Sequence, residues 1–206
     1  MVGLVAAQHV VDEVGREADL PPGLALAGVV ALVVATIVLY NRLVKSKQMV
    51  EEGWSGISVQ LKRRRDLIPN LLAAVKGYMA HEKGVLEKVT ELRAKSEAAE
   101  GSDPAERARI EGALSGALVR LFAVMENYPD LKASQNVIDF QDALEDIENH
   151  LQMSRRYYNG AVRNLNVMVE SFPSNLVAGQ FGFRKAQYFE LDDEQDRAVP
   201  QVEFKS

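Results

Sequence analysis

The chain has 206 residues, of which 47% are hydrophobic and 26% are charged, and its formal net charge is −5. This length accommodates one soluble domain beside one membrane helix, and the absence of cysteine excludes disulfides, thiolate nucleophiles and cysteine-ligated metals. Residues 41–93 carry 11 basic and 6 acidic side chains, net +5, whereas residues 94–206 carry 12 basic and 19 acidic, net −7. One half of the soluble part can therefore attract the other half, or that of a neighbouring copy.

An uncharged apolar segment, Leu24–Tyr40, follows a short acidic tail of residues 1–23. As a helix it would be roughly 25 Å long, near the short limit for crossing a bilayer. A cleaved signal peptide is disfavoured, because the preceding residues are acidic and no small-residue cleavage site follows. A buried core helix of this length usually carries a polar stripe, which this segment lacks. The sequence therefore predicts a single transmembrane helix over residues 24–40.

The Lys and Arg residues around this segment predict its orientation. Arg16 precedes the segment, whereas Arg42, Lys45 and Lys47 follow it closely. Because the cytoplasmic flanks of membrane helices are enriched in Lys and Arg, we expect the N-terminus outside and the large domain in the cytoplasm.

Beyond residue 40 the pattern becomes amphipathic and predicts four helices, at about residues 41–66, 70–99, 104–127 and 134–171. In the first, Gly53 and Gly56 flank Trp54 and would let another helix approach closely. Pro69 cannot continue a regular hydrogen-bond ladder, so it predicts the end of the first helix and a turn into the second. The apolar residues of these helices recur at heptad-like spacing and form seams along them. Helices of one chain or of several chains can bury such seams equally well.

The third helix has a strong start signal in Asp103-Pro104-Ala105-Glu106. Asp103 can cap the helix, Pro104 suits the first position, and Glu106 completes an arrangement like a capping box. The predicted buried face of this helix comprises Ile110, Leu114, Ala117, Leu121 and Val124. A loop is expected over residues 130–133, before the fourth helix.

Residues 173–206 lose the helical periodicity and concentrate aromatic side chains. We expect an irregular tail that packs along a groove on the chain's own bundle, in preference to a groove on a neighbouring copy. The aromatic residues that would make this contact are Phe181, Phe183, Tyr188 and Phe189.

The basic cluster Lys62, Arg63, Arg64 and Arg65 admits several interpretations. Ion pairing near a helix end is favoured, because Arg pairs well with carboxylates. Contact with anionic lipid would require a helix lying down or a second membrane, because the cluster lies about 33 Å beyond the anchor along a straight helix. Nucleic acid is disfavoured, because one short cluster on an acidic domain is a poor footprint. The cluster is also a candidate surface for a protein partner.

The motif search predicts no enzyme. The sequence has no phosphate-binding glycine loop and no nucleophile elbow. His81-Glu82 begins like a zinc-protease motif, but Val85 stands where the second His is needed. A carboxylate-rich metal site remains an alternative that we disfavour, its members being His81, Glu82, Glu126, Glu145 and Glu148. No catalytic residue, metal or cofactor is therefore expected.

Polar residues also fall near the predicted seams and indicate a buried polar network. In the fourth helix Arg155, Arg156 and Asn159 surround Ser154, and we expect them to meet carboxylates of the second and third helices. The candidate members of this network are Glu82, Glu126, Glu148, Arg155, Arg156 and Asn159.

Several short motifs follow one another in a characteristic order: Tyr40–Val44, Trp54–Arg64, Asp66–Leu71, Val75–Tyr78, His81-Glu82, Glu126–Lys132, Tyr157–Asn159 and Phe172–Asn175. In this order they resemble the LemA family, from residue 24 onward. Gly53 departs from the family pattern, in which a helix-favouring residue such as Ala is expected before the Trp. The match is long and ordered, so it is more specific than any one motif.

The resemblance implies a single-pass protein of the bacterial inner membrane, with an all-α, antiparallel up-and-down four-helix bundle in the cytoplasm. It implies no catalytic residues, since the family has no established enzymatic activity. Some relatives belong to magnetosome membranes, which implies a part in membrane organisation. We therefore expect a non-enzymatic scaffold that contacts the bilayer and self-associates through its bundle or its tail. The alternative is an adaptor that docks a cytoplasmic protein, such as a membrane protease or signalling protein, through the basic cluster or the tail.

Overall fold

The computed structural model describes residues 21–190, so the predicted outer tail and the end of the C-terminal tail lie outside the described residues. The chain divides into two compact units. The described part of unit 1 comprises residues 21–48 and 164–185, and that of unit 2 comprises residues 49–163 and 186–190.

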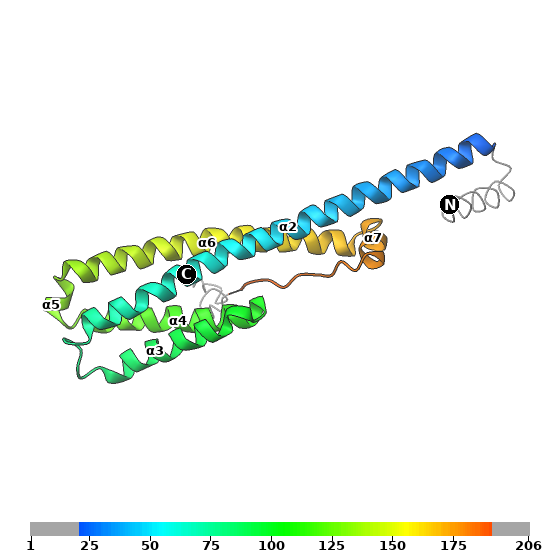
Figure 1. Ribbon diagram of the computed structural model, residues 1–206. Helices are drawn as coiled ribbons and strands as arrows, with labels where there is room; N and C mark the ends of the chain where they lie inside the picture. Colours follow the sequence, from blue (N-terminus) through cyan, green and yellow to red (C-terminus); the bar gives the residue numbers. More distant parts are fainter. Residues whose placement is uncertain (1–20, 191–206) are drawn as a thin grey trace, which may run out of the picture. The chain divides into compact units, whose positions relative to one another are not determined.

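Helices account for every regular element between residues 21 and 190, where no strand forms (Figure 1). The all-α class is therefore confirmed for this part of the chain. In order, the elements are α2 (Pro22–Val75), α3 (Lys83–Ala98), the 3₁₀ helix η1 (Ala99–Gly101), α4 (Pro104–Met125), α5 (Pro129–Lys132), α6 (Gln135–Glu170) and α7 (Ser174–Gln180).

The first helix continues through Pro69, so the predicted helix end at this proline is wrong. Proline has no N–H to bond the carbonyl of Arg65, four residues earlier. In the structure the Arg93 Nε donates to that carbonyl at 3.4 Å, so the missing backbone bond has a substitute. Burial of Ile68, Leu71 and Val75 along the same face holds the helix past the proline.

The second predicted helix therefore begins at Lys83 instead of residue 70. Residues 76–82 form turns in which the N–H groups of Tyr78 and Met79 bond the carbonyl of Val75. Gly77 lies in this turn, and the buried Met79 anchors it to the core. Local glycine and a buried side chain, and not Pro69, mark the boundary between the two helices.

Two further stretches expected to be irregular form short helices. In α5, Pro129 occupies the start of the helix and Leu131 is buried, so the predicted loop is helical. In α7, Val177 and Ala178 are buried, so the first part of the predicted irregular tail is also helical. The start of α4 agrees with the sequence, because the Asp103 carboxylate accepts hydrogen bonds from the Ala105 and Glu106 amides at 3.1 and 3.0 Å.

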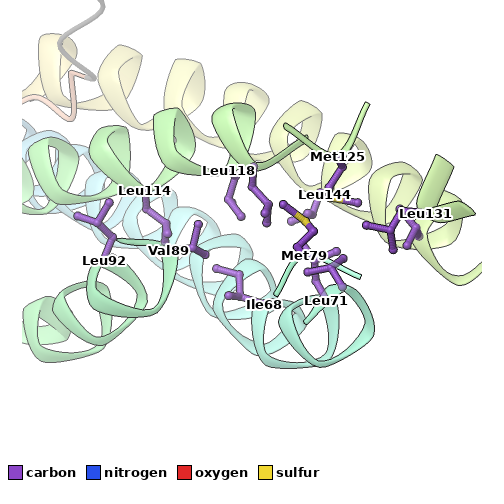
Figure 2. Packing of buried hydrophobic residues seen from close by; sticks show 13 residues of the cluster. Ile68, Leu71, Met79, Val89, Leu92, Leu114, Leu118, Met125, Leu131 and Leu144 are labelled. Atoms are coloured by element: carbon purple, nitrogen blue, oxygen red, sulfur yellow. The ribbon is translucent and has the colours of Figure 1, made fainter. Parts of the chain in front are cut away.

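In unit 2, α3 and α4 lie side by side (Figure 1), and buried side chains form two apolar clusters, the larger of which is drawn in Figure 2. The larger cluster comprises Ile68, Leu71, Val75, Met79, Val89, Leu92, Leu114, Leu118, Leu121, Met125, Leu131, Val137 and Leu144. The smaller comprises Ile57, Leu61, Ala108, Leu151, Tyr158, Val162 and Phe189. Each of α2, α4 and α6 contributes to both clusters, with a short stretch of helix between its two contributions.

Unit 1 combines the N-terminal part of α2 with the end of α6 and with α7. Leu43 is fully buried there, and the Ser46 hydroxyl donates to the Met168 sulfur at 3.3 Å. The preceding turns of α2 expose most of their large apolar side chains, from Leu24 to Val38. This helix is long and apolar enough to cross a membrane.

Candidate functional site

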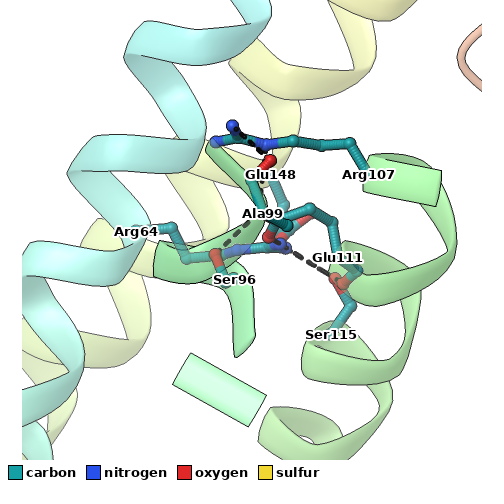
Figure 3. Close-up of polar contacts among 7 residues, drawn as sticks. All are labelled: Arg64, Ser96, Ala99, Arg107, Glu111, Ser115 and Glu148. Carbon is teal, nitrogen blue, oxygen red and sulfur yellow. Dashed lines mark hydrogen bonds and ion pairs between the residues drawn. The ribbon is translucent and has the colours of Figure 1, made fainter. Parts of the chain in front are cut away.

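A buried ionic centre lies between the two apolar clusters of unit 2. The residues of its central ion pairs fall between the contributions of the two clusters along α2, α4 and α6. Arg64 lies between Leu61 and Ile68 on α2, at a position that continues the alternating three- and four-residue spacing of the buried face. On α4, Glu111 likewise falls between Ala108 and Leu114. The residues that surround Arg64 come from α3, α4 and α6 (Figure 3).

Arg64 forms the hub of this centre. Its guanidinium pairs with the carboxylates of Glu111 and Glu148 and donates to the Ser115 hydroxyl at 2.6 Å. A further hydrogen bond of 3.3 Å runs from Arg64 to the backbone carbonyl of Glu111. The Ser96 hydroxyl donates to the other carboxylate oxygen of Glu111 at 2.7 Å. Arg64 of α2 thus contacts α4 and α6 directly, and α3 joins through the hydrogen bond from Ser96 to Glu111.

Arg107 approaches the same carboxylate from the other side. Its Nε lies 3.6 Å from Glu111 Oε1, and its Nη1 donates to the Ala99 carbonyl at 3.3 Å. Burial lowers the pKa of Arg107, and the charge of Glu111 opposes that change. An arginine stays protonated in proteins, so Glu111 lies between two permanent cations.

The centre holds more buried positive than buried negative charge. Arg64, Arg65 and Arg107 are buried, whereas only Glu111 is a buried carboxylate among the described residues. Arg65 reaches the exposed Glu100 at 3.5 Å, and Glu148 is half exposed. The Nε atoms of Arg64 and Arg107 and the Nη1 of Arg65 make no hydrogen bond within residues 21–190.

Ion pairing is the chemistry that this arrangement shows directly. Both carboxylates that contact Arg64 are engaged with a guanidinium, and the Ser96 hydroxyl donates to one of them, that of Glu111. A buried ion pair adds little net stability compared with apolar packing, but it penalises any register that separates the charges. The centre therefore fixes which helix turns face one another.

A second set of contacts holds the segment after α7. The Phe189 ring is buried at a centroid distance of 5.8 Å from Trp54, and Trp54 lies 5.5 Å from Tyr158. The Asn159 side chain accepts from the Phe189 amide at 3.0 Å and donates to its carbonyl at 3.1 Å. The Tyr158 hydroxyl donates to the Gln187 carbonyl at 2.8 Å, and burial raises the pKa of this tyrosine to about 12. Residues 186–190 are therefore called the strap.

The residues predicted to contact a partner are separated in the structure. Arg64 and Arg65 are buried, so the basic cluster presents Lys62 and Arg63 at the surface, where Arg63 bonds Gln60 at 3.3 Å. Phe181 and Phe183 contact the Tyr40 ring in unit 1, while Phe189 is buried and Tyr188 is partly exposed in unit 2.

The predicted polar network does not form as one network. Glu148 joins Arg64, and Asn159 joins the strap. Glu82 accepts a 3.3 Å hydrogen bond from Tyr128, whose pKa is raised by desolvation and by that carboxylate. Of the remaining three, Glu126 and Arg156 are exposed and Arg155 is half-buried.

Four members of the ionic centre were not predicted from the sequence: Ser96, Arg107, Glu111 and Ser115. The predicted face of the third helix passed through Ile110 and Ala117, whereas the buried face passes through Ala108, Glu111, Leu114 and Leu118. The available signal was the spacing itself, because a charged residue at a seam position needs an opposite charge on a facing seam.

No group of three His, Asp or Glu side chains suited to a metal ion occurs within residues 21–190.

Comparison with known proteins places these features in a family. The sequence model of the LemA family matches residues 53–204. The chain is 24% identical to magnetosome protein MamQ 2 of Paramagnetospirillum magneticum, over 91% of this chain and 79% of that protein. It is 23% identical to magnetosome protein MamQ of Magnetospirillum gryphiswaldense, over 90% and 79%. It is 26% identical to protein LemA of Metamycoplasma hominis, over 74% and 69%. The resemblance seen in the motifs is confirmed, and the chain belongs to the LemA family.

Proposed function

We propose that this protein is a non-enzymatic, membrane-anchored scaffold that associates with copies of itself and helps to organise a bacterial membrane. The observation that carries the proposal is α2, a single helix from Pro22 to Val75. Its first part exposes a continuous apolar surface, and its later part carries the hub of the ionic centre. One element thus belongs both to the proposed anchor and to the proposed bundle.

The anchor comprises Leu24–Tyr40, whose exposed apolar side chains are matched by lipid better than by water. The cytoplasmic flank is the one that holds Arg42, Lys45 and Lys47. This assigns the N-terminus to the outside and the soluble part to the cytoplasmic face of the inner membrane. Two relatives are magnetosome proteins, and this supports a part in building a membrane structure.

The soluble part is proposed to be an antiparallel up-and-down bundle of four long helices, formed by α2, α3, α4 and α6. Side chains from all four contribute to the larger apolar cluster, and the ionic centre also draws on all four. Such a bundle acts through shape and surface and not through bond chemistry, which fits the ion-paired state of the buried Glu111 and the half-exposed Glu148.

Self-association is supported by a row of small residues on the exposed surface of the anchor. Gly23, Ala27, Ala31 and Ala35 follow one another at four-residue spacing, so they lie along one side of the helix. Membrane helices associate through such rows, because small side chains let the backbones approach closely. The row therefore provides a surface for a second copy.

The row suggests a direct test by energy transfer between labelled copies in vesicles. Replacing both Ala27 and Ala31 with Leu would fill the surface and lower the transfer efficiency. The matched control replaces Ala25 and Val29 with Leu, at the same spacing but on the opposite side of the helix. Equal transfer in the two variants and the wild type would remove the row from the proposal.

A second candidate function is an adaptor that docks a cytoplasmic protein. It is favoured by a mostly apolar groove of about 950 Å³ between the end of α2 and α3. The residues that line the groove are Leu72, Ala73, Lys76, Met79, Ala80, Lys83, Leu86, Glu87, Thr90 and Glu91. A purified partner that binds the wild type and the exposed-site control Val119→Arg, but not Leu86→Arg, would support this function.

A further inference from the structure

An uncharged stretch surrounds α7. No Asp, Glu, Lys or Arg occurs from Ser171 to Phe183, between Glu170 and Arg184. An uncharged run of this length at the end of a long polar helix is unusual on a surface that faces water, because exposed surfaces are rich in charged residues. Its surroundings must therefore be identified.

Three large apolar side chains of this stretch are mostly exposed. Phe172 is 79% exposed and Leu176 is 64% exposed, and Phe181 is 54% exposed although its ring contacts Tyr40. The small side chains of Ser174 and Ala178, with Val177, fill the buried side instead. The stretch thus leaves three large apolar side chains exposed, which is the opposite of what a segment packed only against its own chain does.

The aromatic contacts fix where this stretch lies relative to the anchor. Tyr40 closes the apolar segment of α2, and tyrosine is enriched at membrane–water interfaces. Its ring lies 4.9 Å from that of Phe181 at an angle of 61°, and 5.8 Å from that of Phe183 at 71°. A ring in contact with Tyr40 lies at nearly the same depth as Tyr40.

The charges of unit 1 fit an anionic lipid surface at this depth. Its described residues contain one acidic side chain, Glu170, which pairs with Lys185 at 2.6 Å. The basic side chains of the same residues are Arg42, Lys45, Lys47, Arg184 and Lys185. Basic residues beside a membrane helix are attracted to anionic headgroups.

We propose that residues 172–183 form an interfacial lipid-binding segment, with Phe172, Leu176 and Phe181 inserted into the leaflet at which α2 leaves the bilayer. The inference rests on the proposed membrane crossing of Leu24–Tyr40. It gives the protein a second membrane contact, more than 120 residues after the first in the chain. The occupant is lipid and not a second protein, because the contact with Tyr40 makes this surface continuous with that of the anchor.

Because the chain contains no cysteine, one fluorescent label can be placed at any chosen site of the full-length protein. An environment-sensitive NBD label is attached to Leu176→Cys, and the protein is reconstituted in phosphatidylcholine–phosphatidylglycerol vesicles. Shallow and deep nitroxide lipids then report whether, and how deeply, the label contacts lipid. Two comparably exposed aliphatic sites serve as controls, Leu32→Cys in the anchor at 70% exposure and Val119→Cys on α4 at 69%.

The proposal predicts blue-shifted emission at residue 176 that shallow nitroxide lipids quench more strongly than deep ones. The label at residue 32 should be quenched mainly by deep nitroxides, and the label at residue 119 by neither. A blue-shifted but unquenched label at residue 176 would mean that protein covers the segment, and would overturn the proposal. Emission like that at residue 119 would overturn it too. An unquenched label at residue 32 would refute the membrane crossing itself and the interfacial placement with it, independently of self-association.

Discussion

Neutralising Glu111 is the sharpest test of the ionic centre. In Glu111→Gln the side chain keeps its size and can still accept a hydrogen bond from Ser96, but it loses its charge. Arg64 then retains one charged partner, the half-exposed Glu148, beside its neutral partners, and Arg107 retains its hydrogen bond to the Ala99 carbonyl. Two buried guanidinium groups would share almost no buried counter-charge.

The expected cost follows from this geometry. Removing one partner of a buried ion pair typically destabilises a protein by about 3–5 kcal/mol, because the remaining charge stays desolvated. For a chain of this size each kcal/mol lowers the melting temperature by about 2–4 °C. We therefore expect Glu111→Gln to melt about 10 °C below the wild type, with the loss concentrated in unit 2.

Circular dichroism at 222 nm during heating, in the same lipid or detergent for every variant, measures this change. The matched control is Glu106→Gln, because Glu106 pairs with Arg109 on the same helix at an exposed site. Exposed pairs contribute about 0–1 kcal/mol, so this control should melt within a few degrees of the wild type. A Glu111→Gln protein that melted together with Glu106→Gln would refute the assignment of a charge-dependent core.

Three other substitutions test separate contacts of unit 2. Gly53→Ala should destabilise the protein by about 1–3 kcal/mol, because the added Cβ would lie 2.9 Å from the Tyr158 Cα. The control Gly116→Ala has open space around it and should stabilise α4 by up to about 1 kcal/mol. Equal melting temperatures of the two variants would contradict the close approach of Tyr158 to Gly53. Phe189→Ala should release the strap, because truncating a buried Phe costs about 3–5 kcal/mol. Trypsin should then cleave faster after residues 184 and 185. Tyr188 is partly exposed, so the control Tyr188→Ala should leave the cleavage rate unchanged. Burial raises the pKa of Tyr158 to about 12 in the folded chain, against about 10 in the unfolded chain. Its contribution to the free energy of unfolding is therefore complete below about pH 10 and is lost between about pH 10 and 12, by up to about 3 kcal/mol. Tyr158→Phe should flatten that part of the profile of stability against pH.

Features set by local chemistry were predictable from the sequence. The apolar helix over residues 24–40 follows from an uncharged run, and the Asp103 cap follows from a short motif whose partners are two and three residues away. The long helix α6 begins and ends within a residue or so of its prediction, because Phe172-Pro173 and the turn after α5 limit it. None of these depends on knowing which helices face each other.

Pro69 shows where local rules fail. The backbone of α2 loses one hydrogen bond there, and the guanidinium of Arg93, 28 residues away from Arg65, occupies the free carbonyl. Two buried residues of α2 beyond the proline, Leu71 and Val75, add apolar contacts that outweigh the local penalty. A contact from another helix thus lets α2 continue past the position at which the proline predicted its end.

The ionic centre was missed for a related reason. The run Lys62–Arg65 looks like one surface feature in the sequence, but a helix turns its members in different directions. Arg64 falls on the buried face and Lys62 and Arg63 do not. The partner Glu111 was passed over because the predicted face of α4 was rotated by one position, which only the facing helices could correct.

The mass of the full-length protein in lipid tests the central claim most directly. Mass photometry of protein extracted with its surrounding lipid, at several protein-to-lipid ratios, separates discrete assemblies from single chains. Self-association through the anchor predicts a discrete oligomer that becomes smaller when Ala27 and Ala31 are replaced by Leu. A single-chain mass at every ratio would contradict the scaffold proposal and leave the adaptor as the function to pursue.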